Sequence, residues 1–312
     1  MRRLRPATPL KLWTLTALAS VIAWSVVGNA CAQGGSVERD QSALVALYNS
    51  TDGTNWESSS GWLSDSPLDE WYGVFTNGRG RVTFLNLSSN ELTGTIPAEL
   101  ADLSNLEHLD LSDNQLTGTI PAELGNLAKL GWLYLWGNQL TGTIPPELGN
   151  LANLLVLNLA GNRLTGTIPP ELGDLANLGV LDLNGNQSTN QLTGTIPAEL
   201  GDLANLEVLD LSGNQLTGTI PPELGDLANL EVLYLWGNQL TGTIPTELGD
   251  LANLEWLSLS RNQLTGMIPA ELGNLANLEL LNLSGNQLTG CMPAGLRDVR
   301  RDLSDGLPLC SE

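Results

Sequence analysis

The single histidine of the chain lies in a pattern that could form a nucleophilic catalytic site. His108, Asp110 and Ser112 alternate with apolar residues, so their side chains point to the same side of an extended segment. A serine nucleophile, a histidine base and an orienting carboxylate could together catalyse acyl transfer. However, side chains two residues apart on one strand lie about 6.6 Å apart, which is too far for the hydrogen bonds that this chemistry requires. We therefore predict that the chain is not an enzyme.

Large aromatic residues point to a different chemistry, the binding of a ligand by stacking and apolar contact. Two of the segments that carry them share the sequence Tyr-Leu-Trp-Gly, which duplication of one segment would also explain. Exposed aromatic side chains on a rigid strand are typical anchors of binding surfaces, and they also suit carbohydrate stacking. The aromatic residues that we predict to bind a ligand are Trp132, Tyr134, Trp136, Tyr234, Trp236 and Trp256.

Charged residues lie between and beside these aromatic residues. The aspartates are expected to make a solvated, negative groove that favours a basic partner. The histidine could tune binding near pH 6, but an ordinary surface histidine is the better explanation. The charged or titratable residues that we predict to bind a ligand are His108, Asp110, Asp113, Asp182, Asp210 and Arg261.

A repeated unit must position all of these residues. From Val82 onward the unit L-x-x-L-x-L-x-x-N-x-L-T-G-x-I-P-x-E-L-G-x-L-x-N occurs nine times, every 24 residues except for one interval of 28. In the sixth copy, Leu209 and Leu211 point to one side of a short strand, and Asn214 is expected to satisfy backbone groups where the chain leaves that strand. Leu224 closes the unit in a short 3₁₀ or irregular segment. One copy cannot bury its leucines alone, so the copies must stack into a solenoid.

This unit resembles the plant-type, 24-residue subclass of the leucine-rich repeat family, which is marked by L-T-G-x-I-P. The motif stands at Leu92–Pro97 in the first copy and as Leu-Thr-Gly-Cys-Met-Pro at Leu288–Pro293 in the last. The resemblance implies a curved right-handed superhelix of nine repeats plus end caps, with a concave parallel β-sheet and convex 3₁₀ or irregular segments. Members of this family are mostly recognition modules of receptor ectodomains, secreted inhibitors of cell-wall-degrading enzymes and microbial surface proteins.

The predicted organisation places other segments on both sides of the repeats. Residues 1–32 combine basic residues, an apolar stretch and the sequence Ala-Cys-Ala, which is typical of a secretory signal peptide. A lipid anchor on Cys31 and an uncleaved N-terminal anchor are the alternatives. Residues 33–81 are interpreted as an N-terminal cap, 82–301 as the nine repeats, and 291–312 as a C-terminal cap that overlaps the last repeat.

Both caps are expected to cover the exposed ends of the core. In the plant relatives a cysteine pair usually brackets the stretch that corresponds to Trp71–Val74, and neither cysteine is present here, so this cap must hold by packing. Asp40 is expected to N-cap a helix that extends through Tyr48. Cys291 and Cys310 form an even pair that would make one disulfide in an oxidising compartment. The residues expected to bury apolar surface in the N-terminal cap are Leu44, Val45, Leu47, Trp56, Trp62, Leu63 and Trp71.

Composition excludes several other classes of protein. The chain has 13 basic and 34 acidic residues, a formal net charge of −21, so its field repels nucleic acid. It has no phosphate-binding loop and no set of cysteines and histidines with metal-ligand spacing, so we predict neither a cofactor nor a metal. No apolar run after residue 32 is long enough to span a membrane. A monomer is expected, because equal charges on two solenoids repel each other.

We therefore predict a secreted or cell-surface recognition module that binds a protein or polysaccharide on its concave face. The first alternative is a secreted inhibitor of an extracellular hydrolase. A second alternative is an ice-binding protein, because pairs such as Thr117 and Thr119 recur along the solenoid and resemble known ice-binding surfaces. Against it, the first threonine belongs to the repeat consensus, and the pattern breaks at Met267 and Cys291. The 28-residue interval is expected to bulge as a loop within residues 186–191.

Overall fold

The computed structural model describes residues 36–185, 190–297, 299, 301–303, 307, 308 and 310. The chain divides into two units, Met1–Ser36 and Val37–Glu312, and every element below belongs to the second unit. The predicted signal peptide with Cys31, and the inserted residues 186–189, lie outside the described residues.

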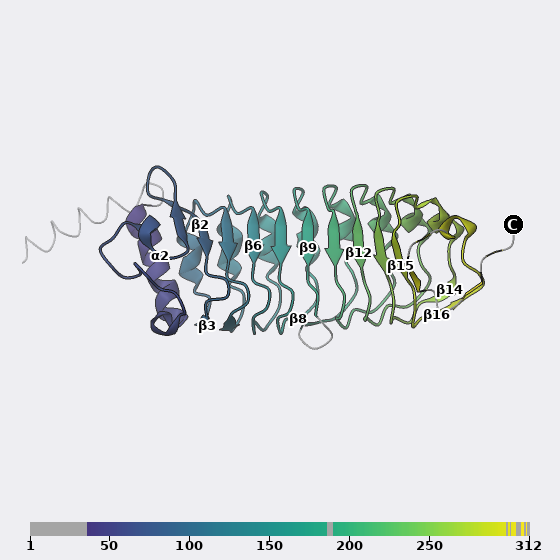
Figure 1. Cartoon of the computed structure of the whole chain (residues 1–312), viewed down its shortest axis with the longest axis horizontal. Helices are drawn as coiled ribbons and strands as arrows, with labels where there is room; N and C mark the ends of the chain where they lie inside the picture. The colour runs from purple at the N-terminus through teal and green to yellow at the C-terminus, as the bar shows by residue number, and fades with distance from the viewer. Residues whose placement is uncertain are drawn as a thin grey trace, which may run out of the picture. The chain divides into compact units, whose positions relative to one another are not determined.

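The repeats form one long sheet, which confirms the predicted solenoid. Ten of its strands are parallel, and each pairs with the equivalent residues of the next repeat, while the first strand is antiparallel. Figure 1 shows these strands side by side in chain order. They are β1 (Val74–Thr76), β2 (Val82–Asn86), β4 (His108–Asp110), β6 (Trp132–Tyr134), β7 (Val156–Asn158), β9 (Val180–Asp182), β11 (Val208–Asp210), β12 (Val232–Tyr234), β13 (Trp256–Ser258), β15 (Leu280–Asn282) and β17 (Arg301–Leu303).

Shorter strands and 3₁₀ helices (η) complete each repeat. In each repeat proline precedes the 3₁₀ helix, where its fixed φ suits an entry, and a buried leucine such as Leu148 anchors it. This confirms the predicted 3₁₀ segments. The short strands are β3 (Thr93–Thr95), β5 (Gln115–Thr117), β8 (Thr165–Gly166), β10 (Gln191–Leu192), β14 (Thr265–Met267) and β16 (Gln287–Thr289). The helices of the repeats are η3 (Ala98–Asp102), η4 (Ala122–Asn126), η5 (Pro146–Asn150), η6 (Pro170–Asp174), η7 (Ala198–Asp202), η8 (Pro222–Asp226), η9 (Thr246–Asp250), η10 (Ala270–Asn274) and η11 (Ala294–Leu296).

A ladder of buried asparagines joins the repeats, as the sequence predicted. The Asn138 side-chain amide donates to the carbonyls of Leu111 and Leu135 at 2.9 and 3.1 Å, and its oxygen accepts from the Leu116 N–H at 3.0 Å. Because one of these carbonyls belongs to the preceding repeat, each asparagine satisfies buried backbone groups across an interface between repeats. The same bonds recur from Asn114 to Asn286.

The N-terminal cap differs from its predicted form. The helix α2 spans Val37–Ser50, so Asp40 lies inside its first turn and does not cap it. The Asp40 carboxylate is instead fully buried against Arg81, with contacts of 2.7 and 2.8 Å, and accepts from the Val82 N–H at 2.9 Å. This ion pair fixes the helix to the first repeat.

The apolar part of the N-terminal cap is mostly as predicted. Trp56, Trp62 and Trp71 are buried and pack in series, edge to face and then tilted, with ring centroids 4.8 and 5.1 Å apart. Leu63 was predicted to be buried, and this is wrong, because it lies in a turn with φ of 59° and is half exposed. Val45 is only partly buried. The remaining helices of the cap are η1 (Gly53–Asn55) and η2 (Leu68–Glu70).

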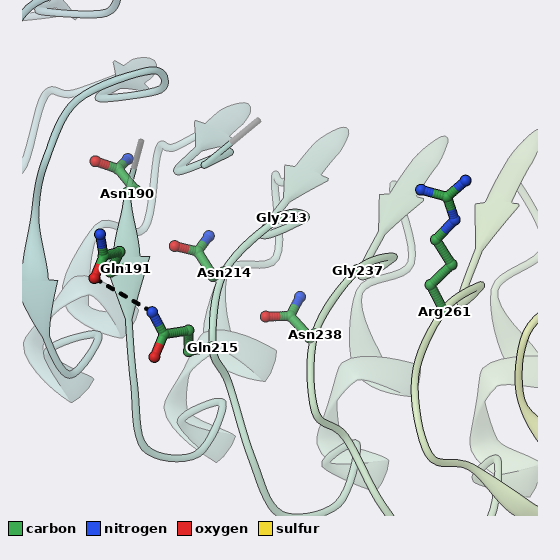
Figure 2. A pocket seen from close by; sticks show the side chains of 8 residues that line it. All are labelled: Asn190, Gln191, Gly213, Asn214, Gln215, Gly237, Asn238 and Arg261. Atoms are coloured by element: carbon green, nitrogen blue, oxygen red, sulfur yellow. Dashed lines mark hydrogen bonds between the residues drawn. The ribbon is translucent and has the colours of Figure 1, made fainter. Parts of the chain in front are cut away.

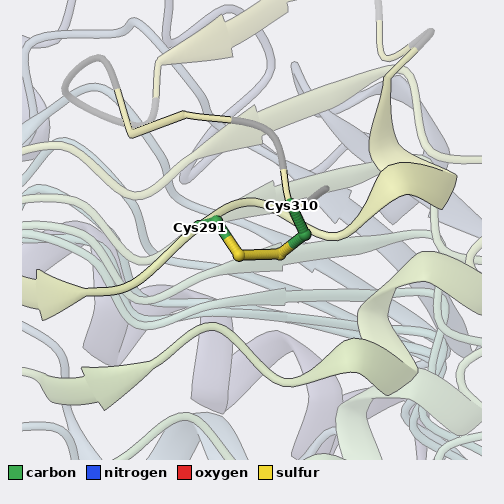
Figure 3. Close-up of a disulfide and its surroundings, with 2 residues drawn as sticks. All are labelled: Cys291 and Cys310. Atoms are coloured by element: carbon green, nitrogen blue, oxygen red, sulfur yellow. A yellow bond between two sulfur atoms is a disulfide. The ribbon is translucent and has the colours of Figure 1, made fainter. Parts of the chain in front are cut away.

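The predicted disulfide closes the other end of the repeats. Cys291 and Cys310 are bonded, with Cα atoms 4.9 Å apart (Figure 3). Beside the bond, the Met292 N–H donates to the Pro308 carbonyl and the Cys310 N–H donates to the Met292 carbonyl. The described end of the chain is therefore tied back to the last repeat.

Candidate ligand-binding face

The exposed side of the large sheet, which we call the sheet face, consists of three columns of side chains. In each repeat the leucines of the strand point into the core, and the three residues between and after them point outward. Because the strands pair in register, equivalent residues align across the repeats. The first column is Phe84, His108, Trp132, Val156, Val180, Val208, Val232, Trp256 and Leu280; the second is Asn86, Asp110, Tyr134, Asn158, Asp182, Asp210, Tyr234, Ser258 and Asn282; the third is Ser88, Ser112, Trp136, Ala160, Asn184, Ser212, Trp236, Ser260 and Ser284.

Aromatic side chains gather at the N-terminal end of this face. His108 stacks on Phe84 with ring centroids 4.1 Å apart, and the Trp132 and Tyr134 rings lie 6.0 and 5.5 Å from the His108 ring. Trp132 and Trp136 remain 37% and 40% exposed. We call this group, together with the exposed Phe75 beside Phe84, the first aromatic patch.

Two members of this patch, Phe75 and Phe84, were not predicted from the sequence. Phe75 comes from the antiparallel strand β1, outside the repeats, so repeat alignment alone does not place it. Phe84 stands in the same column as His108 and Trp132, so alignment of the first repeat with the others would have found it.

A second aromatic patch lies further along the sheet and contains Tyr234, Trp236 and Trp256. The Tyr234 and Trp256 rings are nearly parallel, with centroids 6.5 Å apart, and Trp256 is 42% exposed. Strands β7, β9 and β11 separate β6 from β12. Four steps of about 4.8 Å put the two patches about 19 Å apart.

Polar side chains on β7, β9 and β11 fill the space between the patches. The Asn158 amide donates to Asp182 at 3.0 Å, and the Asn184 amide donates to Asp210 at 3.1 Å and to Ser212 at 2.7 Å. We call these five residues the polar centre. The hydrogen bonds of the polar centre link the repeats of β7, β9 and β11 into one polar surface.

The aspartates of the sheet face also have a structural role that the sequence analysis missed. One oxygen of Asp110, Asp182 or Asp210 accepts from the backbone N–H two residues later, at 2.9–3.1 Å. This bond holds the turn at the end of each strand. An aspartate or asparagine two residues before the turn is the signal that could have revealed it. Asp113 lies in that turn, where its carboxylate accepts from the Ser89 hydroxyl.

Burial changes the acidity of several groups on this face. It raises the pKa of Asp182 to about 6, and the neighbouring Asp210 charge adds to this, although bonds from Asn184 and Asn158 oppose it. Burial also raises the pKa of Tyr134 and Tyr234, helped by Asp110 and Asp210 respectively. Burial lowers the pKa of His108, against the attraction of Asp110.

The possible catalytic group at His108 has the wrong geometry for nucleophilic catalysis. The Ser112 hydroxyl donates to Asp110 and not to His108. Within the described residues, the His108 ring contacts aromatic rings and makes no hydrogen bond to Asp110 or Ser112. Also within the described residues, no group of three or more histidine, cysteine or acidic side chains could hold a metal ion.

The remaining predicted site residue, Arg261, belongs to neither aromatic patch, although it follows the strand that carries Trp256. It occupies the turn after β13, and its exposed side chain borders a hollow that also contains Gln191 and Gln215 (Figure 2). The predicted set therefore divides into the two patches, the polar centre, the Asp113 turn and this arginine.

The fold is a solenoid of stacked repeats with one long parallel sheet, and the chain belongs to the leucine-rich repeat family. Leucine-rich repeat models match residues 80–140 and 228–288, a two-copy model matches 204–249, and a single-repeat model matches 153–175. A search of the curated proteins finds no match. No helix among the described residues is long and apolar enough to cross a membrane.

Several solved structures share this fold. The ectodomain of the Arabidopsis thaliana membrane receptor kinase GASSHO1/SCHENGEN3, in complex with CASPARIAN STRIP INTEGRITY FACTOR 2, is 40% identical over 83% of this chain and 34% of that chain, with a TM-score of 0.69. The Arabidopsis receptor kinase HAESA, in complex with a peptide hormone and a co-receptor, is 32% identical over 88% and 53%, with a TM-score of 0.61. A plant ice-binding protein is 30% identical over 89% and 97%, with a TM-score of 0.69. The chain thus spans about a third to a half of the length of these receptor ectodomains.

Proposed function

We propose that this chain is a non-enzymatic recognition module that binds an extended segment of a protein ligand outside the cell. The segment crosses the strands of the sheet face and contacts both aromatic patches and the polar centre. The observation that carries this proposal is the pair of exposed aromatic patches on one rigid, in-register sheet. Receptor ectodomains with this fold and 32–40% identity were solved with peptide ligands or protein factors, which supports it. The disulfide suits an oxidising compartment.

The chemistry of the face defines the ligand that it suits. The aromatic patches offer flat apolar surfaces about 19 Å apart, a span of about six residues of extended chain. Between them, Asp182 and Asp210 present carboxylate oxygens beside amide groups. We therefore expect a segment with apolar side chains at both ends and basic or amide groups in the middle.

The test is selection of peptides from a random library by the intact protein, followed by measurement of their dissociation constants. In the double variant Trp136→Ser/Trp236→Ser, each tryptophan becomes the serine that most repeats carry in this column, so the fold should be retained. We expect binding of the selected peptides to weaken at least tenfold, since aromatic anchors of interfaces each contribute on the order of 1–2 kcal/mol or more.

The matched control removes an exposed apolar side chain elsewhere. Leu155 is 39% exposed and lies where five other repeats carry glutamate, so Leu155→Glu should leave peptide binding unchanged. Equal affinity of wild type and the double tryptophan variant would overturn the proposed site. The hydrolase-inhibitor alternative uses the same face, and inhibition of a basic hydrolase that the double variant fails to inhibit would favour it.

Ice binding is a second candidate function, and the threonine columns favour it. Thr117 at the end of β5 and Thr119 just after it are both exposed, and equivalent threonine pairs follow in the next repeats. Each first threonine also donates its hydroxyl to a glycine carbonyl of the preceding repeat, as Thr117 does to Gly94 at 2.9 Å, so its orientation is fixed. The similarity to a plant ice-binding protein covers 97% of that protein.

The experiment for ice binding is thermal hysteresis of the purified protein. If the threonine columns bind ice, Thr143→Lys/Thr195→Lys should abolish hysteresis, because two charged side chains break a neutral, regular surface. The tryptophan double variant serves as the control and should retain it. Absence of hysteresis in the wild type would exclude this function and would leave the peptide proposal untouched.

A further inference from the structure

A hollow beside the turns of repeats five to eight differs chemically from the rest of the molecule. It encloses about 480 Å³, which falls in the range of roughly 300–1,000 Å³ typical of small-ligand sites. Figure 2 shows Gln191 and Gln215 at one end, Arg261 at the other, and asparagines of the ladder between them. Although the chain carries 34 acidic residues, no carboxylate is among the described residues that line this hollow.

The arginine occupies a backbone position that is unfavourable for it. Arg261 has φ of 55°, and at the equivalent position five other repeats have glycine with φ between 64° and 70°. A side chain costs free energy in this left-handed region, where glycine does not. Asp113 has a similar φ, but its carboxylate bonds to Ser89. The Arg261 side chain makes no hydrogen bond or ion pair with any residue that the structure describes. No interaction among the described residues therefore offsets the free-energy cost of this backbone conformation.

The wall between the two ends is rigid, and the hydrogen-bonding groups of its asparagines are already paired within the protein. Asn214 and Asn238 donate their amides to backbone carbonyls and accept from the backbone N–H of Leu192 and Leu216. Gly213 and Gly237 leave the floor without side chains. Three polar side chains therefore remain for a ligand: the Arg261 guanidinium and the Gln191 and Gln215 amides, which contact each other only weakly at 3.4 Å.

We propose that this hollow binds an acidic oligosaccharide, with a uronic acid carboxylate on Arg261 and sugar hydroxyls on the two glutamines. A guanidinium pairs with a carboxylate through two parallel hydrogen bonds, and amide groups can both donate to and accept from hydroxyls. The net charge of −21 does not prevent this, because charges beyond about 8 Å are screened at physiological ionic strength. The site is separate from the sheet face and does not depend on the peptide proposal.

The test is titration of the whole chain with a trisaccharide that ends in glucuronic acid, against its carboxyl methyl ester, by calorimetry and by NMR of the glutamine side chains. We expect binding of the acid to shift the Gln191 and Gln215 amide signals and to weaken with added salt. The methyl ester should bind at least tenfold more weakly. In Arg261→Gly, which introduces the glycine that six other repeats carry, the acid should also bind at least tenfold more weakly, without loss of folding.

Two control measurements test whether binding is specific for Arg261 and for the trisaccharide. Lys129→Asn removes a positive charge at a position where other repeats carry asparagine, and it should leave binding of the trisaccharide unchanged. A peptide with a free carboxyl terminus and its amidated form test the alternative source of a carboxylate. Equal binding of the acid and its ester, unchanged binding in Arg261→Gly, or tighter binding of the free-carboxyl peptide than of the trisaccharide would each overturn the proposal.

Discussion

The aspartates of the sheet face serve the fold and the surface at once. Asp110, Asp182 and Asp210 each use one oxygen to hold the end of a strand and the other to bind an amide of a neighbouring strand. The charge that a ligand meets is therefore fixed in place by the backbone. This reduces the entropy that ordering these side chains would otherwise cost on binding.

Asp182 should make the stability of the protein depend on pH. Its pKa is about 6 in the folded state and 3.8 ordinarily, so the folded state holds its proton up to a higher pH than the unfolded chain does. The free energy of unfolding should therefore fall as pH rises from about 4 to 6, by at most about 3 kcal/mol. In Asp182→Asn this fall should disappear, because an amide does not ionise and its oxygen still accepts from Asn184. Chemical denaturation at pH 4 and pH 7 measures both.

Asp250→Asn is the matched control, since Asp250 is exposed and the equivalent residues Asn126 and Asn150 are asparagines. It should alter the free energy of unfolding by less than about 0.5 kcal/mol at either pH. If the free energies of unfolding of the wild type and of Asp182→Asn differ by the same amount at pH 4 and at pH 7, the assignment of the pH dependence to Asp182 is wrong.

At the scale of elements, the repeats were predictable and the N-terminal cap was less so. The strands, the 3₁₀ helices and the asparagine ladder follow from one unit that occurs nine times, because the buried positions of every copy repeat the same pattern. Asp40 looked like a helix cap because its preference for that position is local. Its actual partner, Arg81, is 41 residues away, and a single sequence does not reveal such pairs.

The candidate site also divides into residues that the sequence could place and residues that it could not. Trp132, Tyr134, Trp136 and their later equivalents could be placed on one face from the alternation with leucine. Phe75 could not, because it reaches the first patch from a strand with no repeat pattern. The hollow at Arg261 could not be predicted either, since it depends on the φ of turns and on which side chains are absent.

The buried ion pair should make Asp40 essential to the N-terminal cap. In Asp40→Asn, Arg81 would lose its charged partner in a buried setting, and we expect a loss of about 3 kcal/mol in the free energy of unfolding of this region. Hydrogen exchange of amides in α2 and β2 measures the effect locally. Arg39→Ala breaks the exposed pair with Asp102 and should cost less than about 1 kcal/mol. Equal protection of α2 in the two variants would show that the cap holds by packing alone.

At the scale of the whole molecule, most of the negative charge lies away from the sheet face. One exposed glutamate lies in the first turn of each 3₁₀ helix from η3 to η10, and these equivalent residues follow one another along the repeats. Like charges at such a spacing repel each other and oppose folding. The row consists of Glu99, Glu123, Glu147, Glu171, Glu199, Glu223, Glu247 and Glu271.

This row should make the protein more stable in salt. We expect the midpoint of thermal unfolding to rise by several degrees between 10 mM and 300 mM NaCl, because the screening length falls from about 30 Å to well under 10 Å. Replacing Glu147, Glu171 and Glu199 with glutamine should raise the midpoint at low salt and reduce its dependence on salt. A midpoint that is insensitive to NaCl would mean that the glutamates are too well solvated to repel each other.

The asparagine ladder makes every interface between the central repeats nearly interchangeable, and this has a consequence for evolution. Loss or duplication of one 24-residue unit between β6 and β12 would leave each remaining interface intact. It would also move the two aromatic patches closer or further apart by one strand spacing, about 4.8 Å. The number of repeats between the patches therefore sets the length of ligand that can contact both. A lineage could change that length by gaining or losing whole repeats, without altering the residues of either patch.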